Sequence, residues 1–173
     1  MSTFLILDQV RGQKNFVRTV AAKLGEEVLL EDRETPGVGQ DRRATGMQIL
    51  ACICKASQAL TSPGGKGITF TAAGHGWIVD DFSSASGAKC DGIVDPDLVG
   101  NVAEGDTFLV FRRGPMNFIS SASISAGAAV KPADGGKFAP ATSETPPQRC
   151  GRAVVAATAG DQTRRGWFDF TQP

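Results

Sequence analysis

The sequence predicts a mainly β protein: a small antiparallel β-barrel or sandwich, with one short helix and an N-terminal arm. Three observations lead to this fold class. From residue 66 onward, short runs rich in β-branched and aromatic residues are separated by Gly, Asp, Asn and Pro. The 173 residues include 21 Gly and 9 Pro, which favours many turns over long helices. One segment alone, 47–60, has convincing helical periodicity.

The N-terminal third is the less regular part of the chain. Residues 3–7, "TFLIL", are typical of a short extended arm, and the segment 15–24 fits either a strand or a helix. Residues 28–30 are a short strand candidate, and a charged loop broken by Pro and Gly follows up to residue 46. In 47–60, "MQILACICKASQAL", apolar side chains recur at helical spacing, and "TSPGG" supplies stop signals; a buried strand through "MQILACIC" is the alternative. The side chains at that spacing are Ile49, Ile53, Ala56 and Leu60.

The remaining chain is expected to consist of short strands joined by tight turns. Strand candidates are "GITFTAA", "GWIV", "DGIV", "DTFLVFRR", "MNFIS", "AAVKP", "GRAVVAA" and "GWFDF". Four segments are candidate hairpin turns, because Gly, Asp and Asn tolerate positive φ: "EGD", "RGPMN", "ADGGK" and "AGDQ". The residues on both sides of "DGG" are expected to pair as antiparallel strands. The large core side chains are predicted to be Phe108, Phe111, Phe118, Trp167 and Phe170.

Length and charge limit the organisation and the partners. We expect an N-terminal part at 1–65, holding the arm, the charged loop and the helix, and a β domain at 66–173. The 18 basic and 18 acidic residues cancel, so neither a nucleic acid nor a membrane surface is an expected partner. The start of the chain lacks the pattern of a signal peptide, and no apolar run approaches the length of a membrane span. The four cysteines are expected to be free thiols of a protein made in the cytoplasm.

No set of side chains predicts catalysis, a cofactor or a metal. "PGGKGIT" departs from the phosphate-loop pattern, because Lys66 is followed by Gly and then by a strand. His75, the only histidine, is expected to be a solvated loop residue. Five acidic side chains lack the spacing of a calcium loop and are expected to be solvated loop carboxylates: Asp80, Asp81, Asp91, Asp95 and Asp97. The Arg pairs at 42–43, 112–113 and 164–165 fit surface ion pairs or interface contacts.

The order of several glycine-centred motifs resembles the capsid cement, or head decoration, proteins of tailed bacteriophages. In that family a strand ending in "G-P" is followed by an "aGaaV…dGGk" hairpin and by a closing "G-x-A…a-GD" hairpin. Together the matching motifs cover about the last half of the chain, and each is short and consists of turn residues. The matching residues are Gly105–Asp106, Gly114–Pro115, Gly127 to Val130, Asp134 to Lys137, Gly151 to Ala153 and Gly160–Asp161.

The resemblance implies a non-enzymatic virion protein, synthesised in the host cytoplasm, that binds the outer surface of the capsid and bridges capsomers. Its implied partners are the major capsid protein and further copies of itself, as a homotrimer. Residues 1–65 have no counterpart in the resemblance, but an extended arm could add a strand to a neighbouring subunit. The interaction candidates in the arm are Phe4, Leu5, Ile6 and Leu7. Two alternatives stay open: a tail or baseplate β-domain of a phage, and a small β-barrel enzyme or ligand binder that uses His75, Asp80 and Asp81.

Overall fold

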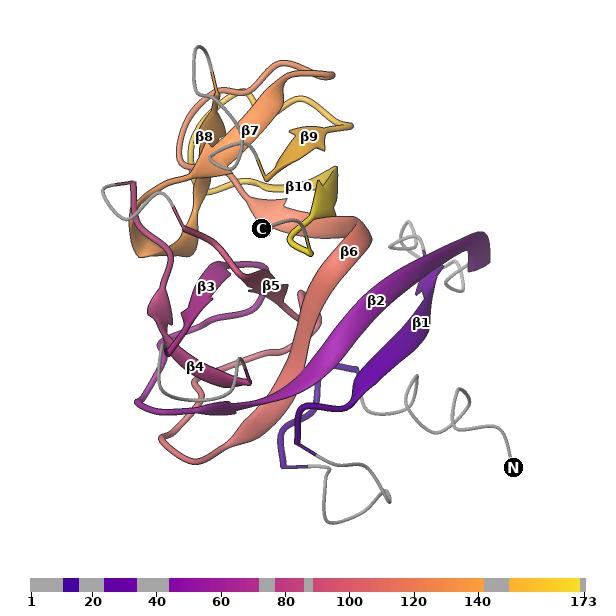
Figure 1. Cartoon of the computed structure of the whole chain (residues 1–173). Coiled ribbons are helices and arrows are strands. Elements are labelled where there is room, and N and C mark those ends of the chain that lie inside the picture. Colours follow the sequence, from indigo (N-terminus) through magenta and orange to yellow (C-terminus); the bar gives the residue numbers. More distant parts are fainter. Residues whose placement is uncertain are drawn as a thin grey trace.

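The computed structural model describes residues 11–15, 24–33, 44–71, 77–85, 89–141 and 150–171, without the side chains of 31–33 and 44–46. Within these ranges the chain forms ten strands in one mixed sheet and a three-residue 3-10 helix, which confirms the predicted mainly β class (Figure 1). The elements are β1 (Glu27–Arg33), β2 (Ala44–Ala56), β3 (Gly67–Phe70), β4 (Ile78–Phe82), β5 (Gly92–Val94), β6 (Thr107–Ile119), β7 (Ala129–Pro132), η2 (Asp134–Gly136), β8 (Phe138–Pro140), β9 (Gly151–Ala153) and β10 (Thr163–Asp169).

The helix predicted over 47–60 is wrong, and the alternative strand is right. Strand β2 is buried on both faces: Cys52 and Cys54 belong to one apolar cluster, whereas Ile49, Ala51 and Ile53 belong to another. A strand buried on both faces has apolar residues at almost every position, so it also satisfies the helical spacing. The predicted strand at 28–30 is confirmed as part of β1, which pairs with β2 in antiparallel register.

Five strands pair in a closed circuit, which we call the ring. Strand β2 pairs with β4, β4 with β3, β3 with β5, β5 with β6, and β6 returns to β2. The β2–β4 pair is parallel and the other four are antiparallel. The apolar cluster that these strands share includes Cys54, Ile68, Val79, Val94 and Phe108.

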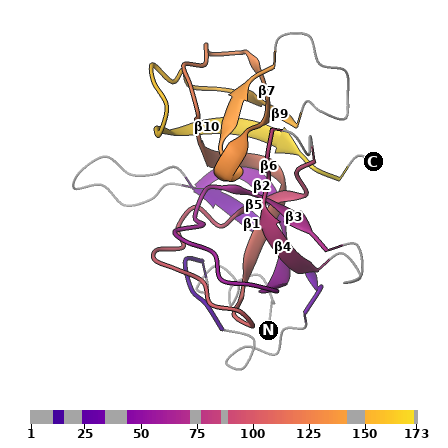
Figure 2. The same ribbon diagram turned by 90° about the vertical axis from the view of Figure 1, so that its left-hand side faces the viewer.

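The second half of β6 continues into a further group of strands, which we call the C-terminal sheet. Its order is β6–β10–β9–β7–β8, and it lies above the ring in both views (Figures 1 and 2). A bridge between Ser120 and Phe138 brings β8 back against the end of β6. The rings of Phe118, Phe138 and Phe168 meet in edge-on contacts at the centre of this sheet, with centroids 5.2–5.7 Å apart.

The segment "RGPMN" lies inside β6, so the hairpin turn predicted there is wrong. Gly114 has φ +119, a conformation that L side chains rarely adopt, and an added Cβ would lie 2.7 Å from the carbonyl oxygen of Gln48. The glycine therefore lets β6 pass close to β2 without reversing direction.

The other three predicted turns each lie in a connection between strands or before a strand. "ADGGK" joins β7 to β8, and Val130 pairs with Pro140 in antiparallel register, which confirms this hairpin. "EGD" forms a turn before β6, closed by the N–H of Asp106 donating to the carbonyl of Ala103 at 3.1 Å. "AGDQ" lies in the longer connection between the antiparallel neighbours β9 and β10.

Four of the five predicted core aromatics are buried, and Trp167 is not. Phe108, Phe111, Phe118 and Phe170 are at most 7% exposed, whereas Trp167 is 45% exposed. Gly166 and Phe168 face the interior of the C-terminal sheet, so alternation along β10 turns the indole outward. The predicted division at residue 65 stays a prediction; β1 and β2, which precede it, belong to the same sheet as the later strands.

Candidate functional site

Residues 11–15 lie against the ring and form what we call the N-terminal anchor. The segment is held by loop residues 95–106 and by the first residue of β6, more than 80 positions away along the chain. It is the first described segment after the predicted arm.

Asp95 fixes the first part of the anchor. Its Oδ2 accepts the N–H of Gly12 at 2.6 Å, and its Oδ1 accepts the N–H of Asp97 at 3.1 Å. The side chain of Arg11 forms an ion pair with Asp97 at 3.1 Å and lies over the ring of Phe111 at 5.4 Å from its centroid. Burial raises the pKa of Asp95, against the opposing effects of the Gly12 N–H and of Arg11.

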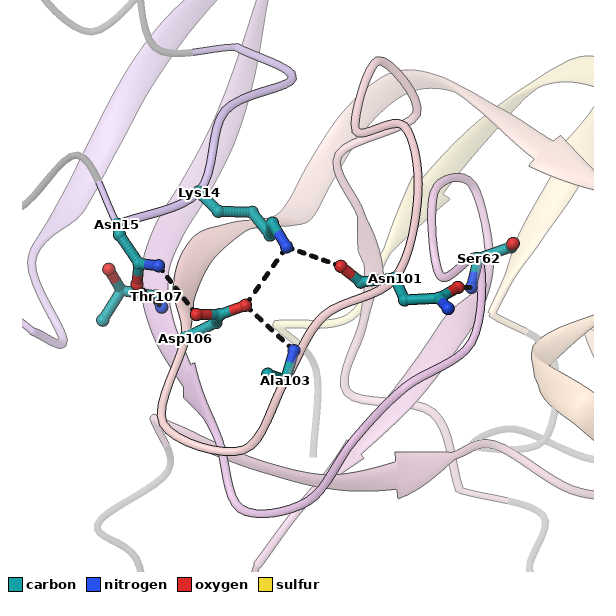
Figure 3. Close-up of polar contacts among 7 residues, drawn as sticks. All are labelled: Lys14, Asn15, Ser62, Asn101, Ala103, Asp106 and Thr107. Carbon is teal, nitrogen blue, oxygen red and sulfur yellow. Dashed lines mark hydrogen bonds and ion pairs between the residues drawn. The ribbon is translucent and has the colours of Figure 1, made fainter.

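Asn15 and Lys14 fix the second part of the anchor (Figure 3). The backbone N–H of Asn15 donates to the carbonyl of Thr107 at 2.8 Å, and the N–H of Thr107 donates to Asn15 Oδ1 at 3.0 Å. Asn15 thereby pairs with the first residue of β6 through its backbone N–H and its side-chain oxygen. Lys14 Nζ donates to the carbonyl of Asn101 at 2.6 Å and forms an ion pair with Asp106 at 3.2 Å.

Asp106 connects the anchor to the turn before β6. One carboxylate oxygen accepts the Asn15 amide at 2.7 Å, and the other accepts the N–H of Ala103 at 2.9 Å. These hydrogen bonds lower the pKa of Asp106, and the hydrogen bond from Asn15 has the largest effect. Since these contacts join residues 12, 14 and 15 to groups at 95–107, the arrangement holds a chain segment in place.

The sequence-predicted residues fall in different places. The arm residues Phe4, Leu5, Ile6 and Leu7, the segment 16–23 and His75 lie outside the described residues. Asp80 and Asp81 are exposed neighbours on β4, so their side chains point to opposite faces of that strand.

The prediction that the acidic cluster is solvated is wrong for Asp95, which is 2% exposed and holds Gly12. Asp91 is also engaged, since it accepts the N–H of Phe70 at 2.8 Å and contacts Lys89 at 3.2 Å. Among the described residues, no group of three or more His, Cys, Asp or Glu could hold a metal ion. The four cysteines are free thiols, three of them buried.

The anchor residues were missed because no local signal marks them. "RGQKN" at 11–15 is a polar segment with a glycine, and nothing in it indicates that its partners are at 95–107.

In the described part of the chain, no helix is long and apolar enough to cross a bilayer.

No protein-family model and no curated protein matches the chain. Among solved structures, the chain is similar to the N base of the head fiber protein gp8.5 of bacteriophage phi29. The identity is 17%, the similarity covers 72% of this chain and 98% of that one, and the TM-score is 0.49.

Proposed function

We propose that this protein is a non-enzymatic structural protein of a tailed-phage virion, which binds the outer surface of the assembled capsid and stabilises the shell by bridging capsomers. The proposal starts from the order of the glycine-centred motifs in the last half of the chain. One of those motifs, "ADGGK", closes the β7–β8 hairpin, a role in which turn residues matter and reactive ones do not.

The observation that carries the proposal is the N-terminal anchor. A free chain end loses much of its binding energy to the entropy of ordering, and a fixed starting point reduces that cost. The Gly12–Asp95 and Asn15–Thr107 hydrogen bonds fix residues 12 and 15 on the ring. The arm that precedes them can then add a strand to the exposed sheet edge of a neighbouring subunit. Its partners would be the major capsid protein and other copies of this chain, arranged as a trimer at a local threefold axis.

The experiment adds the purified protein to isolated capsids that lack it, and measures cosedimentation and the melting temperature of the shell. Three proteins are compared: the full chain, a chain without residues 1–10, and a full-length chain in which Phe4, Leu5, Ile6 and Leu7 are replaced by Ser. The last variant keeps the length of the arm and the whole anchor. We expect the full chain to bind and to raise the melting temperature, and both arm variants to bind more weakly.

The outcomes separate the two parts of the proposal. A full chain that does not bind capsids, or that immunogold labelling finds at the tail, contradicts the proposed function. Arm variants that bind as tightly as the full chain contradict the role of the arm and leave the function standing.

A further inference from the structure

We propose that the outer face of the C-terminal sheet, centred on Trp167, is the surface that docks on the capsid, and that it recognises an acidic protein surface with an apolar depression for the indole. This inference rests on the proposed function and names the docking surface, which the N-terminal arm does not supply.

The face is defined by strand alternation. Strand β10 turns Gly166 and Phe168 inward, and its partner strands do the same with Met116 and Phe118 of β6 and with Ala153 of β9. The alternate residues therefore point outward on one continuous surface. The ones that reach the surface are Arg113 and Asn117 of β6, Arg165, Trp167 and Asp169 of β10, and Arg152 of β9, whereas Pro115 has the same orientation but is buried.

The indole of Trp167 lies among other exposed residues of the face. Trp167 is paired with Arg152 on one side and with Pro115 on the other, so it lies in the middle of the face. Val154 and Val155, which follow β9, are 58% and 49% exposed, and their N–H groups both donate to the carbonyl of Arg165. Two further exposed apolar residues therefore lie beside β10, two positions along that strand from the indole, and a group of exposed apolar residues marks an interaction site more often than scattered ones do.

The composition of the face matches that of a protein-binding surface. Trp and Arg are the side chains most enriched among residues that carry binding energy, and such residues cluster near the centre of an interface. Small side chains lie on the same face of β7 and β8: Ala129 is opposite Arg152, and Ala139 is opposite Lys131. The indole is 45% exposed, and a depression in the partner can enclose this exposed part.

The charge of the face selects the partner. The chain as a whole is neutral, with 18 basic and 18 acidic residues, but most charged residues described on this face are basic. Arg113, Arg152, Arg165 and Lys131 lie on it, and Asp169, which contacts Arg113 at 3.5 Å, is the acidic residue among those described there. Arg152 is exposed beside the indole. Complementarity therefore favours an acidic partner surface, and a contact of this kind weakens as salt rises.

The test compares four variants of the full-length chain in the capsid-binding assay. Trp167→Ala removes the indole and Arg152→Glu reverses the charge beside it. Val99→Ala, at an 87% exposed valine of the loop between β5 and β6, and Lys55→Glu, at an exposed lysine of β2, are the matched controls. Urea denaturation of each variant verifies that it is folded, which is expected because the four side chains are exposed.

We expect Trp167→Ala and Arg152→Glu each to raise the apparent Kd for capsids at least about tenfold, and the two controls to leave it unchanged. We also expect added NaCl to weaken the binding of the wild type. Wild-type binding together with unchanged affinity of Trp167→Ala contradicts the docking surface and leaves the proposed function standing. A wild type that does not bind capsids contradicts both.

Two further measurements examine other occupants of the face. If light scattering shows that Trp167→Ala lowers the number of copies in the oligomer, the face joins copies of this chain and the proposal is wrong. If a mobility-shift assay shows that duplex DNA binds the wild type and not Arg152→Glu, the face recognises a polyanion and the proposal is equally wrong.

Discussion

Asp95 combines two opposing chemical effects in one buried carboxylate. Hydrogen bonds from the N–H groups of Gly12 and Asp97 favour its charged form, and so does Arg11. Burial disfavours that form, as does the charge of Asp97, and the net result is a raised pKa. The residue that holds the N-terminal anchor is therefore a group whose ionisation costs free energy in the folded protein.

This leads to a pH dependence with a definite sign. Because the folded chain binds the proton of Asp95 more tightly than the unfolded chain does, the contribution of Asp95 to the free energy of unfolding falls as the pH rises above 3.8, the ordinary pKa, until Asp95 is ionised in both states. Asp95→Asn removes this contribution. We expect the free energy of unfolding of the wild type, minus that of the variant, to decrease with pH over this window. Urea denaturation of both proteins at a series of pH values measures this difference. The series starts at about pH 3, roughly one unit below the ordinary pKa of Asp. A difference that is flat or that increases contradicts the raised pKa.

At the scale of single elements, β6 connects the two halves of the molecule, and its two central arginines have different surroundings. Arg112 donates to the carbonyl of Phe170 at 3.1 Å and lies over the ring of Phe70, 5.4 Å from its centroid. It thus ties the end of the C-terminal sheet to strand β3 of the ring. Arg113 is 60% exposed and contacts Asp169 at 3.5 Å.

We expect Arg112→Ala to lower the free energy of unfolding by about 1–2 kcal/mol, because a hydrogen bond from a charged donor and a cation–ring contact are both lost. The neighbouring change Arg113→Ala is the matched control and should cost at most about 0.5 kcal/mol, since exposed ion pairs contribute little. Urea denaturation of the two variants provides the comparison. Equal losses would show that Arg112 does not connect the halves.

The same elements show how far the sequence alone leads. Strands with one face in the core and turns with Gly-Gly or Asp-Gly were predictable, because period-two alternation and positive φ are local properties, as the β7–β8 hairpin shows. Strand β2 was mistaken for a helix because burial on both faces removes the alternation. The N-terminal anchor could not be predicted from the sequence, because the Gly12–Asp95 contact joins residues that only the folded ring brings together. Trp167 was assigned to the core because hydrophobicity does not tell which face of a strand is buried.

At the scale of the whole molecule, the question is whether the ring and the C-terminal sheet unfold together. Strand β6 pairs with β2 and β5 in the ring and with β10 in the C-terminal sheet. One cluster of buried apolar side chains includes Ile49 and Ile93 of the ring, Phe111 of β6 and Phe168 of the C-terminal sheet, so it spans both halves. Unfolding either half would expose apolar surface of the other, which makes a partly unfolded state costly.

The two tryptophans allow a direct test, because one lies in each half. Trp77 packs near Phe70 of the ring, with centroids 6.3 Å apart, and Trp167 lies on β10. In Trp167→Phe the fluorescence reports the ring, and in Trp77→Phe it reports the C-terminal sheet. In both variants we expect the fluorescence transition in urea to coincide with the far-UV circular dichroism transition. The reason is that β6 is a strand of both halves, so unfolding it disrupts both. A Trp167 signal that changes at lower urea than the circular dichroism would show that the C-terminal sheet unfolds on its own. In that event the docking face would belong to a unit that unfolds independently of the ring.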